Sequence, residues 1–101
     1  MAFYYIAKIQ DIPEGSGVFS NLQGHSIAVF KITGEYFAIQ NRCPHRGASL
    51  VDGEIKGFVV TCPWHAWQFD IKTGCFLENS QIKLKQYSLE VRHDELWVEL
   101  T

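Results

Sequence analysis

Two short motifs combine cysteine with histidine, the side chains that most often bind transition metals. One spans residues 43–45 and reads Cys-Pro-His; the other spans residues 62–65 and reads Cys-Pro-Trp-His. Each supplies one thiolate and one imidazole, and both groups bind metal when deprotonated. In each, proline follows cysteine directly, which stiffens the backbone and removes an amide donor. The candidate ligands are Cys43, His45, Cys62 and His65.

The residue types alone leave more than one kind of site open. Cys43 and Cys62 could be core residues beside surface histidines, or all four side chains could hold a structural zinc ion. Structural zinc motifs usually pair cysteine with cysteine at short spacing, whereas each motif here is mixed. The mixed motifs therefore favour a centre with two thiolate and two imidazole ligands that is not zinc.

The arrangement resembles that of Rieske [2Fe–2S] domains: Cys-x-His, sixteen residues, then Cys-x-x-His. The similarity extends over residues 43–48 and 62–70, through Thr73-Gly74, and on to the closing segment 84–98. It covers essentially the whole chain. The resemblance implies one [2Fe–2S] cluster, with both cysteines on one iron and both histidines on the other. Neutral imidazoles in place of two thiolates make such a cluster easier to reduce.

The resemblance also indicates a type of Rieske protein. The high-potential branch has two further cysteines, at positions that hold Ala48 and Trp64 here, so their disulfide cannot form. That branch also has a serine and a tyrosine that donate hydrogen bonds to the cluster, where this chain has Trp67 and Phe69. Without those hydroxyls we expect a potential near the low end of the Rieske range, roughly −150 mV.

A low-potential Rieske ferredoxin implies particular partners. We expect an electron carrier, not an enzyme by itself, that takes electrons from a flavoprotein NAD(P)H reductase and passes them to a terminal oxygenase. The alternative is the small subunit of an NADH-dependent nitrite reductase, with that enzyme's large subunit as partner; a zinc-stabilised binding module is a third. The chain is not itself the oxygenase, because only His25 and His93 remain for the mononuclear iron that such an enzyme needs.

Composition sets wider limits. The chain has 101 residues and a formal net charge of −2, without a cluster of basic residues, which suits one domain (1–101) that does not bind nucleic acid. No apolar run approaches the roughly 18 residues of a membrane-spanning helix, and the N-terminus lacks signal-peptide features. We therefore expect a cytoplasmic protein without a membrane partner, as a monomer or weak oligomer.

The sequence reads as β throughout, with Asn21-Leu22-Gln23-Gly24 able to close one hairpin and Thr33-Gly34 another. Helical periodicity is weak, so we predict an all-β, Rieske-like fold of packed antiparallel sheets. A cluster-binding subdomain at about 41–80 is expected to be inserted between two sets of strands. Strands are predicted at 4–9, 17–22, 26–32, 35–40 and 96–100, with a further strand near 87–92 after a bulge or bend near Gln86.

Several single residues carry expectations of their own. Alternation places Tyr87, Leu89 and Val91 on the buried side of their strand. Cys75 is expected to be a small buried hydrophobic residue inside a strand, and Trp67 part of the core. Two residues lie close to the ligands and are left open: Trp64 either shields the cluster or faces a partner, and Arg46 is either a solvated charge or a partner contact. His25 and His93 are expected in turns as surface histidines.

Overall fold

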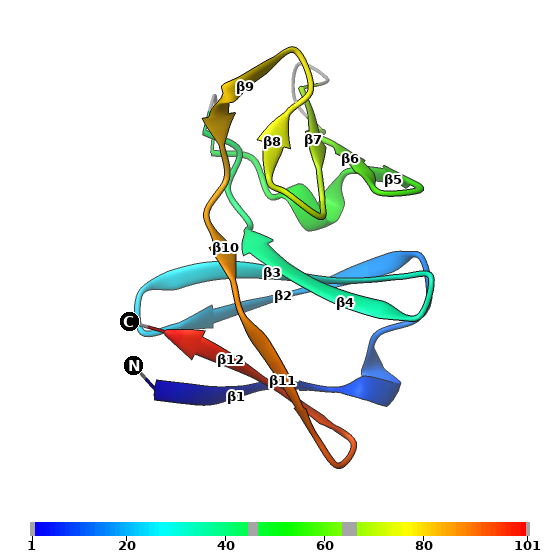
Figure 1. Ribbon diagram of the computed structural model, residues 1–101, viewed down its shortest axis with the longest axis vertical. Coiled ribbons are helices and arrows are strands. Elements are labelled where there is room, and N and C mark those ends of the chain that lie inside the picture. The colour runs from blue at the N-terminus through cyan, green and yellow to red at the C-terminus, as the bar shows by residue number, and fades with distance from the viewer. Residues whose placement is uncertain (1, 45–46, 64–66, 101) are drawn as a thin grey trace.

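The computed structural model describes residues 2–44, 47–63 and 67–100, and it consists of three antiparallel sheets, as the sequence predicted (Figure 1). Two 3-10 turns are the helical segments in this part of the chain: η1 (Ile9–Asp11) and η2 (Leu50–Asp52). The strands are β1 (Ala2–Lys8), β2 (Ser16–Leu22), β3 (His25–Ile32), β4 (Glu35–Gln40), β5 (Glu54–Lys56), β6 (Val59–Thr61), β7 (Gln68–Asp70), β8 (Cys75–Phe76), β9 (Asn79–Lys83), β10 (Gln86–Tyr87), β11 (Leu89–Arg92) and β12 (Glu95–Leu100). Within the described ranges, neither 3-10 turn has the length that a membrane crossing requires.

The sheets are stacked along the long axis of the molecule (Figure 1). A five-stranded sheet of order β5-β6-β7-β8-β9 lies at one end, the four-stranded sheet β10-β4-β3-β2 lies in the middle, and the three-stranded sheet β1-β12-β11 lies at the other end. The chain leaves the middle sheet after β4, builds the five-stranded sheet, and returns as β10 beside β4. Both candidate motifs therefore belong to an excursion from the middle sheet.

The two predicted hairpin turns are present. Leu22 pairs with His25 across Gln23-Gly24, and Ile32 pairs with Glu35 across the turn at 33–34. All four central residues have positive φ, which is the backbone of a type I′ turn and matches the twist of antiparallel strands. These turns set the register of β2, β3 and β4.

Strand β3 is buried on both faces and separates two hydrophobic cores. Ala28, Phe30 and Ile32 point into the first core, which lies between the middle and five-stranded sheets. Ile27 and Val29 point into the second core, toward the three-stranded sheet. A strand covered on both faces has apolar residues in continuous runs, which explains the apolar run at 27–30 in β3.

The predicted change of phase near Gln86 is a transfer between sheets. Strand β9 ends at Lys83, Leu84 is buried in the first core, and the chain then enters β10 at Gln86. Tyr87 and Leu89 pack against the second core, as expected. The two halves of this segment alternate out of phase because they face different cores.

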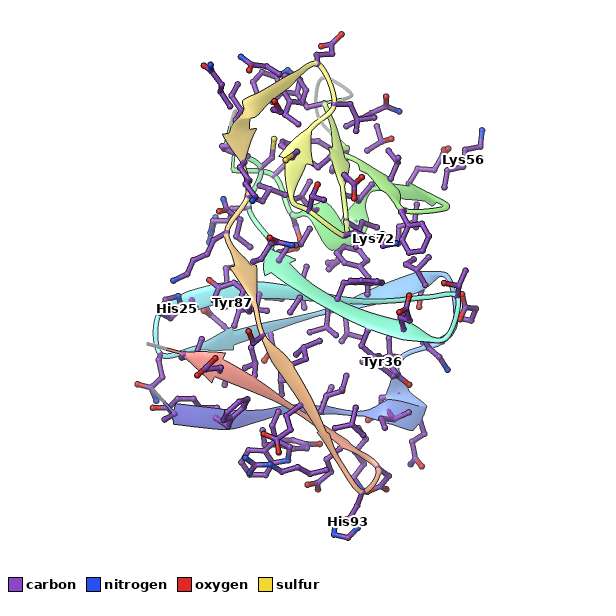
Figure 2. The ribbon with its side chains drawn as sticks, in the orientation of Figure 1. His25, Tyr36, Lys56, Lys72, Tyr87 and His93 are labelled. Carbon is purple, nitrogen blue, oxygen red and sulfur yellow. The ribbon has the colours of Figure 1, made fainter. Side chains whose placement is uncertain are left out.

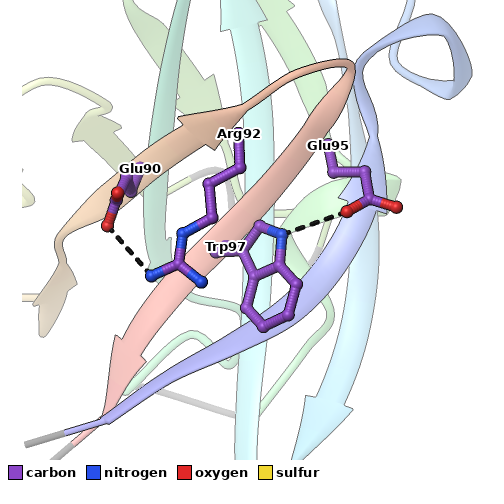
Figure 3. A network of polar contacts seen from close by, with 4 residues as sticks. All are labelled: Glu90, Arg92, Glu95 and Trp97. Carbon is purple, nitrogen blue, oxygen red and sulfur yellow. Dashed lines mark hydrogen bonds and ion pairs between the residues drawn. The ribbon is translucent and has the colours of Figure 1, made fainter.

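The prediction for Val91 was wrong: its side chain is 53% exposed, and Arg92 is the more buried of the two. The Arg92 guanidinium lies 4.6 Å from the ring centre of Trp97 and 5.4 Å from that of Phe3. It also forms a 3.3 Å ion pair with Glu90, and the Trp97 indole N–H donates to Glu95 (Figure 3). Arginine packs well on aromatic faces, so it covers this sheet in place of valine.

Candidate metal centre

The two motifs lie in segments that are closed by backbone hydrogen bonds at the same positions. In the first motif segment (residues 43–48), the Cys43 amide donates to the Ala48 carbonyl at 2.9 Å, and the Gly47 amide donates to the Cys43 carbonyl at 2.6 Å. In the second motif segment (residues 62–67), the Cys62 amide donates to the Trp67 carbonyl at 2.7 Å. Each cysteine therefore bonds the residue five positions later, at the base of its segment.

Both cysteines lie inside the first core. Cys43 is 1% exposed and Cys62 is 2% exposed, and they belong to the same cluster of buried residues. The prolines that follow them are exposed, so each segment passes from the core to the surface within one residue. All three cysteines of the chain lie in the described part, and none of them forms a disulfide. Two cysteine sulfurs in one core, each at the base of a closed segment, fit the ligands of a metal centre, because a bound metal ion deprotonates the thiols that coordinate it.

The predicted histidine ligands, His45 and His65, lie outside the described residues, as do Arg46 and Trp64. Among the residues that the structure does describe, no group of three or more cysteine, histidine or acidic side chains lies together as a metal site. The described part of the site therefore consists of the two cysteines and the residues that hold them.

The second motif segment connects two paired strands. Thr61, at the end of β6, pairs with Gln68 at the start of β7, and the ladder continues through Val60 and Phe69. The side-chain amide of Gln68 (Nε2) also donates to the Thr61 hydroxyl at 3.3 Å. This segment is thus held by a regular ladder inside the five-stranded sheet.

The first motif segment has less regular support. Outside the named strands, its flanks share one isolated bridge, between Arg42 and Ser49. Asn41, a buried polar residue at 3% exposure, makes side-chain hydrogen bonds to Ser49 and Val51. Sequence reasoning missed Asn41, although a polar residue between a predicted strand and a ligand motif is a signal that could have found it.

Gly53 lies against the backbone of Thr61 at the open end of the β5–β6 hairpin, where Glu54 pairs with Thr61. It ends the 3-10 turn η2 that follows the first segment, and a Cβ placed on it would lie 1.9 Å from the carbonyl oxygen of Thr61. Thr61 directly precedes Cys62. Position 53 therefore needs glycine because the backbone leading to the second segment passes too close for any side chain.

Trp67 is half-buried and packs against the first core, so it belongs to the edge of the core and not to its interior. The expectation for Cys75 was half right. It lies in a strand as predicted, β8, but it is only partly buried, whereas its neighbour Phe76 is buried in the first core.

The two remaining histidines lie far from each other. His93 is exposed in the β11–β12 turn, at the end of the molecule opposite the five-stranded sheet (Figure 2). His25 differs from the prediction of a surface turn residue: it begins β3, is partly buried, and its Nδ1 lies 3.1 Å from the Tyr87 hydroxyl. The Tyr87 hydroxyl that meets the imidazole is partly buried, and this burial raises the pKa of Tyr87 above its ordinary value.

Comparison with known proteins places the same features in one family. The model of the Rieske [2Fe–2S] domain family matches residues 2–88. The ferredoxin component of the naphthalene 1,2-dioxygenase/salicylate 5-hydroxylase systems of Ralstonia sp. is 35% identical over 88 residues, which cover 86% of this chain and 85% of that protein.

Solved structures agree with this match. The ferredoxin of Sphingomonas yanoikuyae B1 superposes with a TM-score of 0.90 at 26% identity, covering 99% of this chain and 100% of that one. A chain from the complex of reduced oxygenase and oxidized ferredoxin in carbazole 1,9a-dioxygenase gives a TM-score of 0.87 at 26% identity, covering 95% and 91%.

Proposed function

This chain belongs to the Rieske [2Fe–2S] domain family, and we propose that it carries single electrons from a flavoprotein NAD(P)H reductase to a terminal oxygenase. It is a ferredoxin, the electron-transfer component of a multicomponent system, and its cofactor is a Rieske [2Fe–2S] cluster. The proposal concerns which residues hold that cluster and which proteins exchange electrons with it.

The proposed ligands are Cys43, His45, Cys62 and His65. The observation that carries this assignment is the burial of both cysteines in one core, each at the base of a backbone-closed segment. His45 and His65 complete the two motifs by their spacing from those cysteines. Cys75 is excluded from the set, because it lies in β8 outside both motif segments.

The surrounding residues suit a protein that transfers electrons without exchanging atoms. A bound [2Fe–2S] cluster supplies reversible one-electron reduction. Buried side chains around the cysteines, among them Leu50, Val60 and Phe69, exclude water from the thiolates. Phe69 is fully buried and offers no hydroxyl, and Trp67 stacks on Phe76. This environment favours the low potential expected for a carrier fed by a flavoprotein.

Relatives favour an oxygenase as the electron acceptor over a nitrite reductase. The Ralstonia relative is the ferredoxin of a dioxygenase system, and the carbazole dioxygenase structure contains an oxygenase and a ferredoxin together. We extend that role to this chain and place it in the cytoplasm, where thiols stay reduced until a cluster is inserted.

Metal analysis and variants test the ligand assignment. Purified protein should contain two irons and two inorganic sulfides, with an EPR signal on reduction that averages below the free-electron value. Changing His45 or His65 to alanine, or Cys62 to serine, should abolish that signal. The matched control Cys75→Ser should retain it. Stoichiometric zinc, or loss of the cluster in Cys75→Ser but not in Cys62→Ser, would contradict the assignment.

Stopped-flow measurement of the reoxidation rate tests which protein accepts the electrons. The reduced protein should be reoxidised by a ring-hydroxylating oxygenase during a single turnover, with product formed in proportion to the electrons delivered. The large subunit of a nitrite reductase should reoxidise it no faster than buffer does. Faster reoxidation by the nitrite reductase subunit would favour the alternative role.

A further inference from the structure

We propose that Asn41 is a positioning residue whose carboxamide fixes the first motif segment, and with it the Cys43 and His45 ligands. This inference rests on the proposed function, since it assumes that the segment holds the cluster. Asn41 lies two residues before Cys43, at the point where the chain leaves β4.

Asn41 uses its backbone and its side chain to join three parts of the fold. Its backbone amide donates to the Ser26 carbonyl of the middle sheet at 2.9 Å, and its carbonyl accepts from the Leu50 amide at 2.7 Å. Its side-chain Nδ2 donates to the Ser49 hydroxyl at 2.8 Å, while Oδ1 accepts from the Val51 amide at 3.0 Å. One residue thus attaches the chain that follows the first motif segment to the sheet that precedes it.

The side-chain contacts replace a ladder that this segment lacks. The second motif segment connects β6 and β7, which are joined by three paired residues, so the Gln68–Thr61 side-chain bond there is redundant. The first motif segment is flanked by the isolated Arg42–Ser49 bridge. Beyond that bridge, the Asn41 carboxamide takes the place of the next rung by bonding Ser49 and Val51.

Burial makes these contacts hard to replace. Asn41 is 3% exposed, so water has little access to the carboxamide or to the groups it bonds. Removing the carboxamide leaves the partly buried Val51 amide and Ser49 hydroxyl without this partner, and the start of the 3-10 turn η2 can then shift to recover hydrogen bonds. Such a shift is passed to Cys43 through the Cys43–Ala48 bond. Residues that orient metal ligands in this way typically change metal affinity by about 10–100-fold when replaced.

The test measures the release of iron from holoprotein with an iron chelator, together with the g values of the reduced protein. Asn41→Ala should release iron about tenfold faster than the wild type and shift the g values. The matched control is Gln68→Ala, which removes an exposed amide-to-hydroxyl bond at the base of the second segment. It should release iron at the wild-type rate.

A second control separates positioning from general stability. Val98→Ala removes buried volume in the second core, away from both motif segments, and lowers stability without touching the site. It should leave the g values and the iron release rate unchanged under native conditions. If Val98→Ala and Asn41→Ala released iron equally faster than the wild type, the proposal would be overturned. Wild-type g values in Asn41→Ala would overturn it as well.

Ser49→Ala tests the positioning role of Asn41 if Asn41→Ala does not incorporate a cluster. This variant removes the Nδ2 contact and keeps the bond from Val51. Faster iron release than in Gln68→Ala supports the positioning role, and an equal rate overturns it. A wild-type protein without iron and sulfide would instead contradict the proposed function, so the two failures are distinguishable.

Discussion

The indole ring of Trp67 stacks on the phenyl ring of Phe76, with ring centres 4.3 Å apart and ring planes 14° apart. Phe76 also contacts Phe69 at a centre-to-centre distance of 5.5 Å. Because the Trp67 carbonyl accepts the Cys62 amide, this aromatic group lies directly beside the base of the second motif segment.

Replacing Phe76 with leucine should lower stability by about 1–2 kcal/mol, because the apolar volume is largely kept but the ring contacts are lost. The melting temperature of the holoprotein should fall by roughly 4–16 °C, as expected for a domain of this size. Leu77→Ala, at a neighbouring side chain that is 49% exposed, should shift it little. Equal melting temperatures in both variants would show that the stack contributes nothing.

Phe69→Tyr should raise the reduction potential. Phe69 is fully buried in the same core as both cysteines, and we expect a hydroxyl at this position to donate a hydrogen bond to a ligand sulfur of the bound cluster. A hydrogen bond that favours the reduced state by about 1 kcal/mol raises a one-electron potential by roughly 40 mV. Protein-film voltammetry of the wild type and the variant measures this difference in reduction potential. Phe58→Tyr, at a partly buried ring facing Lys72, is the control and should leave the potential unchanged. An unchanged or lower potential in Phe69→Tyr would show that the new hydroxyl does not stabilise the reduced state.

Gly53→Ala should destabilise the protein and release iron faster. The new methyl group would lie 1.9 Å from the Thr61 carbonyl, so the backbone before Cys62 must move, at a cost of about 1–3 kcal/mol. Gly24→Ala is the comparison, since it has φ +79° but open space around it and costs about 1–2 kcal/mol through backbone strain alone. Both variants should have a lower melting temperature than the wild type. Iron release under native conditions should be faster only in Gly53→Ala. Equal release rates in Gly53→Ala and Gly24→Ala would contradict a link between Gly53 and the second motif segment.

Glu14 should make the free energy of unfolding depend on pH. Its carboxylate accepts the amides of Gly34 and Thr33 in the β3–β4 turn, and these bonds lower the pKa of Glu14. A lowered pKa in the folded state means that the carboxylate stabilises the fold above its unfolded pKa, and that this stability is lost as pH falls through the folded pKa.

Urea unfolding of the wild type and of Glu14→Gln between pH 3 and 8 measures this contribution. The wild type should be the more stable of the two at neutral pH, because a glutamine offers one acceptor oxygen to two amides. The difference should shrink below about pH 4.5, the ordinary pKa of a glutamate. A difference that stays constant down to pH 3 would rule out this role for Glu14.

Features that depend on neighbouring residues could be predicted from the sequence alone. The spacing of cysteine and histidine identified the Rieske family, because the proposed ligands of each motif lie within four residues of each other. Gln23-Gly24 and Thr33-Gly34 defined two hairpins, because the positive φ that a type I′ turn requires is a local property. The all-β class followed from short apolar strands without helical periodicity.

Tertiary structure decided what depends on residues far apart in the chain. Arg92 packs on Phe3 from the opposite end of the sequence, so alternation alone placed Val91 on the wrong side. His25 bonds Tyr87 across 62 positions. The role of Asn41 depends on where β3 and η2 meet the first motif segment. Spacing along the chain selects the ligand types, but only the packing of distant segments determines which residues hold those ligands in place.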